Sequence, residues 1–562
     1  MGKNNVAVDF TWDVKIPMRD GILLSANLYK PKDNNPVPAI LSITPYIADS
    51  LHDRGMFFAQ HGYVYVAVDN RGRGNSEGQF DGFENGLDGY DVVEWIAAQL
   101  WCDGQVAMRG ASFLGGIQWT TLKHYPPHLK SIVPGAATYA GMVTPMLKNI
   151  FIGEEFQWWV GVSGRTANDN ISGDETFWTG IYDELEANHL PFNQLDKIAG
   201  FPSAFFQTVL GHPTVDSFYR DRNLTIEAYK KIDIPILTIS GHYDDTQPAA
   251  VKHFQMHMTH GLPAGQTKHY LLLGPWDHGG VSNPALEVGG LKFHKKSKRD
   301  LNQLHKKWYD WTLKNGPKPE FLKKRITYYV MGAEAWKYAD SLDDIPAKAQ
   351  KYFLNSSCGK AHDVFNAGGM QTDRPGQSLP DRYVYNPLDH PIDPSRNQTD
   401  DYLTDQRFVL SLKNNGLIYH SPVFEEEKEI TGFVKAKLWI AMNVPDTDFQ
   451  VVLFEVLADG TQIRLSQDFL RARYRESNSR ETLVKPGEIN AYVFGEFPFF
   501  SRRIARGSRL RVLISPPGTW YFQKNYNSGG VVAEESGKDA RTAEITLYHD
   551  VQHPSCLEIP II

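Results

Sequence analysis

The sequence has few cysteines, and they are not arranged as a disulfide or zinc framework. Only three of its 562 residues are cysteine, Cys102, Cys358 and Cys556, and they lie far apart. A disulfide framework needs an even set and a cysteine-rich zinc site needs close pairs, so both are excluded. Because this usage suits a reducing compartment, we expect a cytoplasmic location.

Long apolar segments and a strong charge of one sign are missing as well. No segment approaches the roughly 20 uninterrupted apolar residues of a membrane span, and the polar stretch 1–13 lacks the apolar centre of a signal peptide. The net charge of -7 and the isoelectric point near 6.3 give no electrostatic reason to expect nucleic acid or an anionic membrane as a partner. With 41% hydrophobic and 22% charged residues, the chain reads as a globular protein. Its length suffices for two or three domains.

The most informative segment is a sharp turn around Ser112. An apolar run over 106–108 predicts a strand that stops at Gly110, and a helical pattern follows the serine. Such a turn holds a serine hydroxyl clear of its own backbone, at the amino end of a helix. Gly110 lets the chain pass close to its neighbours, and Gly115 lets the helix pack on the strand. The usual nucleophile pattern has its second glycine where this chain has Leu114, so the short motif also fits an ordinary serine in a turn.

Residues further along the chain favour the catalytic interpretation. A hydrolytic serine needs a base that takes its proton and a carboxylate that orients the base. A predicted strand over 234–239 leads to Asp244, and another over 269–273 leads to His278. Because loops after parallel strands share one rim of a sheet, Ser112, Asp244 and His278 are expected to converge there. The order serine, aspartate, histidine is the one that α/β-hydrolases use.

Alternatives to the aspartate and the histidine remain open. An aspartate after a strand is often a helix cap, and one histidine among 19 is usually solvated or in a core. Asp245 and Asp277 are rival carboxylates. Asp277 is the direct neighbour of His278, which makes a side-chain bond to the imidazole awkward, so Asp245 is the more serious competitor.

An acyl-transfer serine also needs hydrogen-bond donors for the oxyanion. The backbone N–H of Phe113 is one candidate, because this residue begins the helix after the turn. Another is the hydroxyl of Tyr46, which follows Pro45 at the end of a buried-strand pattern over 39–44. A tyrosine after a proline can equally be a packing residue. This chemistry needs no metal and no organic cofactor.

Several motifs spread over the chain point to one family. They lie at residues 18–21, 69–78, 101–115, 241–244, 274–278 and 554–560. Taken together, the sequence resembles the cocaine-esterase and X-Pro dipeptidyl-peptidase family of α/β-hydrolases. The resemblance implies Ser112 as nucleophile, Asp244 and His278 as its partners, and an oxyanion hole formed by the Tyr46 hydroxyl and the Phe113 N–H. Phe113 stands where the family usually has tyrosine, a change that should not disable a residue acting through its backbone.

The predicted elements divide the chain into three parts. Over 1–145 and again over 231–345, strand and helix patterns alternate, which indicates a mostly parallel sheet covered by helices. Residues 146–230 lose the strand signal and are rich in aromatic residues, which indicates a helical cap inserted on the catalytic rim. Over 346–562 short strands and turns predict an all-β sandwich, and the resemblance implies a jelly roll. The predicted fold is therefore an α/β-hydrolase core with a helical cap insertion and a C-terminal all-β jelly-roll sandwich.

Cap aromatics are expected to line an apolar substrate pocket. Most of them belong to the core of the cap, but some should face the catalytic residues, as lids of this fold do. The candidates are Trp158, Trp159, Phe177 and Trp178.

The substrate class is less well determined by the sequence. In the resembling family, α-amino-acid ester hydrolases bind the substrate ammonium with carboxylates shortly after the catalytic aspartate, where this chain has Thr246 and Gln247. A neutral pair cannot balance a cation, so the leading hypothesis is a carboxylesterase acting on a small-molecule ester. X-Pro dipeptidyl-peptidase or amide hydrolase activity is the alternative, and homo-oligomers are possible. A different class of protein, a ligand-binding protein that uses the β-sandwich, is also considered.

Overall fold

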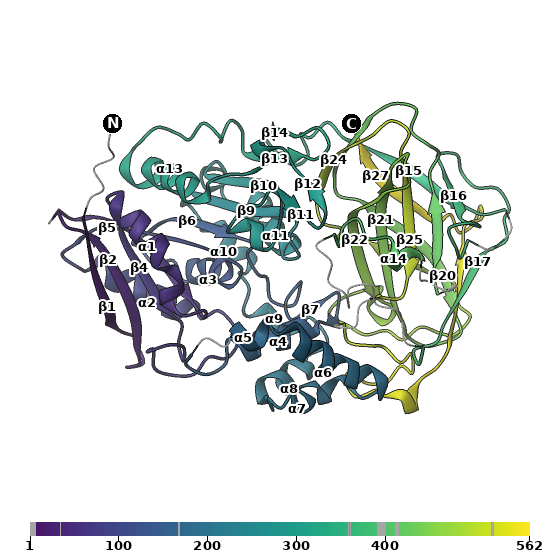
Figure 1. The fold of residues 1–562 in the computed structure, drawn as a ribbon, viewed down its shortest axis with the longest axis horizontal. Coiled ribbons are helices and arrows are strands. Elements are labelled where there is room, and N and C mark those ends of the chain that lie inside the picture. The colour runs from purple at the N-terminus through teal and green to yellow at the C-terminus, as the bar shows by residue number, and fades with distance from the viewer. Residues whose placement is uncertain are drawn as a thin grey trace.

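The computed structural model describes residues 7–562 apart from a few short segments: 34, 167–168, 358, 360, 390–400, 411–414 and 519–521. It has three parts (Figure 1): an α/β part, a group of helices beside it, and an all-β part that contains the C-terminus. This is the fold class that the sequence predicts.

A ten-stranded sheet forms the centre of the α/β part. Its seven inner strands are parallel, and the three outermost strands are antiparallel to their neighbours. The inner strands read as continuous apolar runs because helices cover a parallel sheet on both faces. In order across the sheet the strands are β1 (Val8–Pro17), β2 (Leu23–Pro31), β4 (Val64–Asp69), β3 (Val37–Thr44), β5 (Cys102–Ala111), β6 (Leu129–Gly135), β9 (Ile236–Tyr243), β10 (His269–Asp277), β13 (Ile326–Val330) and β14 (Ala335–Ala339).

Five longer helices pack against this sheet. Side-chain caps start several of them: Asn85 accepts hydrogen bonds from the Leu87 and Asp88 N–H groups, and Asp300 accepts one from the Gln303 N–H. The helices are α1 (His52–Gln60), α2 (Gly86–Ala97), α3 (Phe113–Leu122), α11 (Gln247–His260) and α13 (Leu301–Lys314).

A helical cap is inserted between β6 and β9. Two short strands that the sequence pattern did not reveal, β7 (Met146–Leu147) and β8 (Ile150–Phe151), precede its helices. Aromatic side chains form a separate core within the cap. The helices of this stretch are α4 (Gly153–Gly161), α5 (Asp169–Ser172), α6 (Glu175–Ala187), α7 (Leu195–Ile198), α8 (Ala204–Leu210), α9 (Ser217–Arg220) and α10 (Ile226–Lys230).

Among its described residues, the C-terminal part consists of β-strands with a few short helical turns, one of them α14 (Arg407–Leu410), and it contacts the cap directly. The Asn193 N–H donates to the Ala533 carbonyl at 2.9 Å, and the Lys524 ammonium pairs with Glu186 of α6. The strands are β15 (Lys348–Asn355), β16 (Gly368–Gln371), β17 (Asp381–Tyr385), β18 (Leu417–His420), β19 (Lys428–Gly432), β20 (Lys435–Met442), β21 (Asp448–Val456), β22 (Gln462–Arg471), β23 (Asn490–Phe494), β24 (Phe500–Ile504), β25 (Arg509–Ser515), β26 (Ala543–Tyr548) and β27 (Cys556–Ile561).

The first strand, β1, was not predicted. It lies at the edge of the sheet and pairs only with β2. Most of its side chains are at least partly exposed, including Phe10 at 46% and Trp12 at 56%. Its apolar residues nevertheless alternate with polar ones from Val8 to Ile16, so the sequence did carry a strand signal here and the prediction overlooked it.

The composition predicted that the chain has no membrane-spanning segment and no disulfide framework, and the structure bears on both predictions. No helix within the described ranges is both long and apolar enough to cross a membrane. Cys102 and Cys556 are free and buried, and Cys358 lies outside the described residues.

Buried histidines lie between α11 and the sheet. The His253 ring stacks on Trp119 with ring centroids 4.5 Å apart, and its ring nitrogens contact the Tyr229 hydroxyl at 2.7 Å and the Thr138 carbonyl at 3.0 Å. Burial lowers the pKa of His253 to about 3, although the bond to Thr138 opposes the shift. In the unfolded chain a histidine takes up its proton near pH ~6.5. The stability that neutral His253 contributes is therefore complete above that pH and is lost as the pH falls.

We expect the variant His253→Gln to flatten the acid dependence of stability. Between about pH 4 and 6, wild-type unfolding takes up one more proton than unfolding of the variant, so the slopes should differ by ~1.4 kcal/mol per pH unit. Urea unfolding at several pH values measures both slopes. They should agree above pH ~7, where unfolded histidine is also neutral. Equal slopes in the acid range would contradict this account of His253.

Candidate active site

Ser112 occupies the junction between β5 and α3. The strand ends at Ala111 and the helix begins at Phe113, so one residue makes the whole turn. Its backbone has φ 63° and ψ −127°, a region that residues with a side chain rarely adopt. Such a conformation costs about 1–3 kcal/mol and persists where the surrounding structure enforces it. The turn predicted from the sequence is therefore present in its strained form.

Close packing explains the small residues around this turn. Gly110 has φ 144°, and a Cβ at this position would lie 2.3 Å from the Leu114 Cβ. A Cβ at Gly115 would lie 2.2 Å from the Gly135 carbonyl oxygen of β6. The usual pattern has its second glycine at the position of Leu114. A leucine fits there because the residue facing its side chain, Gly110, has no Cβ.

Asp244 and His278 follow two neighbouring parallel strands. β9 ends at Tyr243 and β10 ends at Asp277, so both side chains emerge at the same rim of the sheet. The Asp244 Oδ1 lies 2.8 Å from the His278 Nδ1. The Asp244 side chain is 0% exposed. It also accepts hydrogen bonds from the Ser240 hydroxyl at 2.7 Å and from the Thr246 hydroxyl at 2.9 Å.

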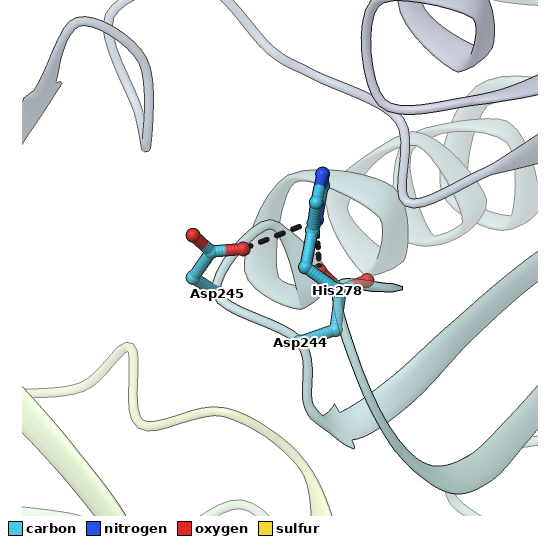
Figure 2. A group of neighbouring side chains, drawn as sticks. All are labelled: Asp244, Asp245 and His278. Atoms are coloured by element: carbon cyan, nitrogen blue, oxygen red, sulfur yellow. Dashed lines mark hydrogen bonds and ion pairs between the residues drawn. The ribbon is translucent and has the colours of Figure 1, made fainter. Parts of the chain in front are cut away.

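The two rival carboxylates have different surroundings. The Asp245 carboxylate also reaches the His278 Nδ1, at 3.2 Å, but its side chain is 76% exposed (Figure 2). Asp277 accepts the Gly280 N–H at 2.7 Å and so caps the turn after β10. A fully buried carboxylate with several donors is a fixed partner for an imidazole, whereas an exposed one can move away into water. The geometry therefore favours Asp244 as the residue that orients His278.

These carboxylates determine the charge of His278. Burial lowers the pKa of His278, but the charge of Asp245 and hydrogen bonds with Asp244 and Asp245 outweigh it and raise the pKa well above its usual range. Among the described residues, Asp244, Asp245 and His278 also have the spacing of metal ligands, with donor atoms within 4.8 Å of one another. Both carboxylates already engage the His278 Nδ1, which makes this group a poor fit for a metal ion.

Ser112 and His278 line one cavity of about 240 Å³. Phe113 lines it too; its N–H lies in the first turn of α3, where helix N–H groups lack partners within the helix. The other lining residues are Gly82, Phe83, Glu84, Thr138, Val143, Thr144, Pro145, Leu147, Ile152, Glu154, Glu155, Trp158, Trp159, Asp245 and Thr246.

The Tyr46 side chain meets the same group of residues. Burial raises its pKa, whereas hydrogen bonds with the Trp158 and Ser112 side chains and the nearby His278 charge lower it. The indole N–H of Trp158 donates to the Tyr46 hydroxyl at 3.0 Å. Tyr46 is not among the cavity's lining residues, but its hydroxyl lies beside Trp158, which does line the cavity, and near Ser112.

The four cap aromatics divide into two pairs. Trp158 and Trp159 of α4 line the cavity. Phe177 and Trp178 of α6 are not among its lining residues. Trp178 is 1% exposed, donates its indole N–H to the Ile171 carbonyl and packs against the Phe177 ring in the core of the cap. The structure thus places the second pair away from the cavity that Ser112 and His278 line.

Sequence reasoning missed the acidic lining of the cavity. Glu84, Glu154, Glu155 and Asp245 all line it, and none of its described lining residues is lysine or arginine. Burial and the charges of Asp245 and Glu154 raise the pKa of Glu155 to about 8. Glu154 and Glu155 lie three to five positions before Trp158 and Trp159. Because residues three or four apart share one face of a helix, this spacing could have predicted that the glutamates line the same pocket as the tryptophans.

The neutral residues Thr246 and Gln247, which the sequence offered as evidence against a cationic substrate, do not decide whether the cavity can bind a cation. Thr246 lines the cavity, but its hydroxyl is bonded to Asp244. Gln247 is fully buried, and its amide binds the Gly241 and Phe499 carbonyls at 2.8 Å each. Acidic side chains reach the cavity from α4 and from the loop before α2 instead.

Comparison with known proteins relates this chain to a family of hydrolases. A model described as X-Pro dipeptidyl-peptidase (S15 family) matches residues 20–280, and one described as X-Pro dipeptidyl-peptidase C-terminal non-catalytic domain matches residues 321–558. Cocaine esterase from Rhodococcus sp. (strain MB1 Bresler) is 28% identical, over 98% of this chain and 98% of that protein.

Two solved structures share the whole fold. An aminopeptidase from a marine sediment Thaumarchaeota archaeon superposes with a TM-score of 0.84 at 21% identity, covering 100% of this chain and 98% of that one. An α-amino acid ester hydrolase gives the same TM-score and identity, with coverage of 100% and 97%. The chain therefore belongs to the cocaine-esterase and X-Pro dipeptidyl-peptidase family of hydrolases.

Proposed function

We propose that this protein is a serine hydrolase that cleaves small-molecule carboxylic esters through an acyl-enzyme intermediate on Ser112. One observation carries the proposal: Asp244 holds the His278 Nδ1 at 2.8 Å, and His278 and Ser112 line the same cavity. Because carboxylates occupy Nδ1, Nε2 is the ring nitrogen that remains to accept a proton. Neutral His278 with its proton on Nδ1, toward Asp244, is the tautomer that serine activation requires.

The reaction proceeds in two steps. The Ser112 oxygen attacks the substrate carbonyl carbon as its proton passes to His278, and Asp244 stabilises the imidazolium that forms. The carbonyl oxygen becomes an oxyanion that accepts hydrogen bonds from the Phe113 N–H and the Tyr46 hydroxyl. When the bond to the leaving group breaks, His278 returns the proton to that group. Water then attacks the acyl-enzyme with the same proton transfers and releases the carboxylic acid.

The acidic lining favours substrates with a positive charge near the acyl group. Glu155 has a raised pKa because it is buried beside two other carboxylates, so a cation bound there would relieve their repulsion. An ammonium group on the acyl or leaving part of an ester meets this requirement. Amides and peptides with a free amino group meet it as well, and aminopeptidase or X-Pro dipeptidyl-peptidase activity is therefore the second candidate.

Replacing the nucleophile tests the proposal directly. Ser112→Ala should fold normally, because glycines and backbone shape the turn, and its turnover of an activated ester should fall by several orders of magnitude. Steady-state hydrolysis and a thermal melt measure both effects. Ser282→Ala, four residues after His278, serves as a matched control and should retain its rate. A Ser112→Ala protein that turns over at a normal rate would rule out this nucleophile.

The two neighbouring aspartates should respond differently to amide substitution. Asp244→Asn should lower kcat by about 10³ to 10⁴ because the imidazole loses its correct tautomer, whereas Asp245→Asn should be mild at the optimum. Since the charge of Asp245 raises the pKa of His278, Asp245→Asn should shift the acid limb of the rate profile to lower pH. Profiles of kcat/KM against pH report both effects. If Asp245→Asn gave the large loss, the exposed aspartate would be the partner of His278.

A matched pair of esters tests the acidic lining. The 4-nitrophenyl esters of leucine and of 4-methylpentanoic acid have the same carbon skeleton and differ by one ammonium group. The wild type should prefer the leucine ester by at least about tenfold in kcat/KM, roughly 1.4 kcal/mol. Glu155→Gln should reduce the preference, while Glu175→Gln on the exposed start of α6 should leave it unchanged. A preference for the neutral ester in the wild type would contradict a cation site.

A further inference from the structure

The Tyr46 hydroxyl depends on a residue of the cap for its orientation. Trp158 lies on α4, and its indole N–H donates to the Tyr46 oxygen at 3.0 Å with the two rings at 75°. An indole nitrogen is only a donor, so the phenol must be the acceptor in this contact. The phenol proton is then free to point elsewhere, and the Ser112 side chain lies near the Tyr46 hydroxyl.

A buried arginine fixes the backbone on which Tyr46 stands. Arg73 is 0% exposed, and its Nε donates to the Pro45 carbonyl at 2.7 Å, directly before the tyrosine. The same guanidinium donates to the Ser163 carbonyl at 2.7 Å, to the Thr166 carbonyl at 3.0 Å and to the Gly164 carbonyl. These last three carbonyls belong to the cap loop that follows α4. One side chain thus joins the loop that carries Tyr46 to the cap element that carries Trp158.

The loop that carries Arg73 is itself held in place. Gly74 donates its N–H to the Arg165 carbonyl at 2.7 Å, and a Cβ on Gly74 would lie 2.1 Å from the Asp69 carboxylate. Asp69 in turn accepts the Ala48 N–H at 2.6 Å, two residues after Tyr46. The stretch 69–78, which the proposed mechanism does not use, therefore braces both ends of the short segment around the tyrosine.

We propose that the cap sets the oxyanion hole: Trp158 orients the Tyr46 hydroxyl and Arg73 holds its backbone, both as positioning residues. This inference rests on the proposed function. Trp158 is then more than a wall of the substrate pocket, the role expected for it from the sequence. The consequence is that a catalytic donor is completed by a contact from the inserted cap, so the α/β core alone does not fix the direction of the phenol proton.

A double-mutant cycle tests the role of Trp158. Tyr46→Phe should lower kcat by about 10² to 10³ with little change in KM. Trp158→Phe keeps an aromatic ring in the cavity and removes the N–H. It should lower kcat by about tenfold and leave KM nearly unchanged. Residues that act as a unit are non-additive, so the double variant should match Tyr46→Phe alone. Trp159→Phe, the neighbouring cavity residue, is the control and should have the same effect whether or not Tyr46 is replaced.

Two results would overturn the inference. If Trp158→Phe lowered kcat by the same factor with and without the Tyr46 hydroxyl, the tryptophan would act on the pocket and not on the donor. If Tyr46→Phe retained the wild-type rate while Ser112→Ala was inactive, Tyr46 would not be an oxyanion donor, although the serine hydrolase proposal would stand.

Arg73→Lys supplies an independent test. Lysine keeps the charge but cannot bridge four carbonyls with a planar fork. The variant should lower kcat, and the loss should shrink when Tyr46→Phe is also present. A loss of the same size in both backgrounds would mean that Arg73 stabilises the fold without positioning Tyr46. The Trp158 cycle decides the proposal if the Arg73 variant does not fold.

Discussion

The strained backbone of Ser112 is the constraint on which the site depends. A residue at φ 63° between β5 and α3 projects its hydroxyl from the rim of the sheet toward the start of a helix. Gly110 and Gly115 allow this conformation because they have no Cβ. The space that a Cβ would need is occupied by Leu114 at Gly110 and by the Gly135 carbonyl at Gly115. The same parallel arrangement brings the ends of β9 and β10, and with them Asp244 and His278, to that rim. The cap then covers it.

Burial distinguishes two carboxylates that contact one imidazole. Asp244 is fixed by donors from Ser240 and Thr246, whereas Asp245 faces the cavity and water. The first can orient His278, and the second changes its charge and adds to the acidic lining. One exposed aspartate thus affects both the basicity of His278 and the charge inside the cavity.

The parts of the fold that the sequence predicted depend on local patterns. The predicted buried strand over 39–44 lies within β3, and the turn at Ser112 has its glycines in the expected places. The order of strands with their following loops was enough to bring Asp244 and His278 to one rim, but it left Asp245 open as the partner of the histidine. β1 was missed although apolar and polar residues alternate along it from Val8 to Ile16.

Other features depend on packing that no local pattern contains. Aromatic character cannot separate Trp158 and Trp159, which line the cavity, from Phe177 and Trp178, which fill the cap. The acidic lining combines Glu84, from a loop, with Glu154 and Glu155, from α4, and these segments meet only in the folded chain. For the same reason the bond from Trp158 to Tyr46 spans 112 positions and was not foreseen.

The central claim is that Ser112 is the acylated residue. The most direct test is to treat the wild-type protein with a fluorophosphonate and to map the adduct by peptide mass spectrometry. The account predicts one adduct per chain, on the peptide that contains Ser112, formed in parallel with the loss of esterase activity. An adduct on a different serine that accompanies the loss of activity would contradict it, as would full activity after complete labelling of Ser112.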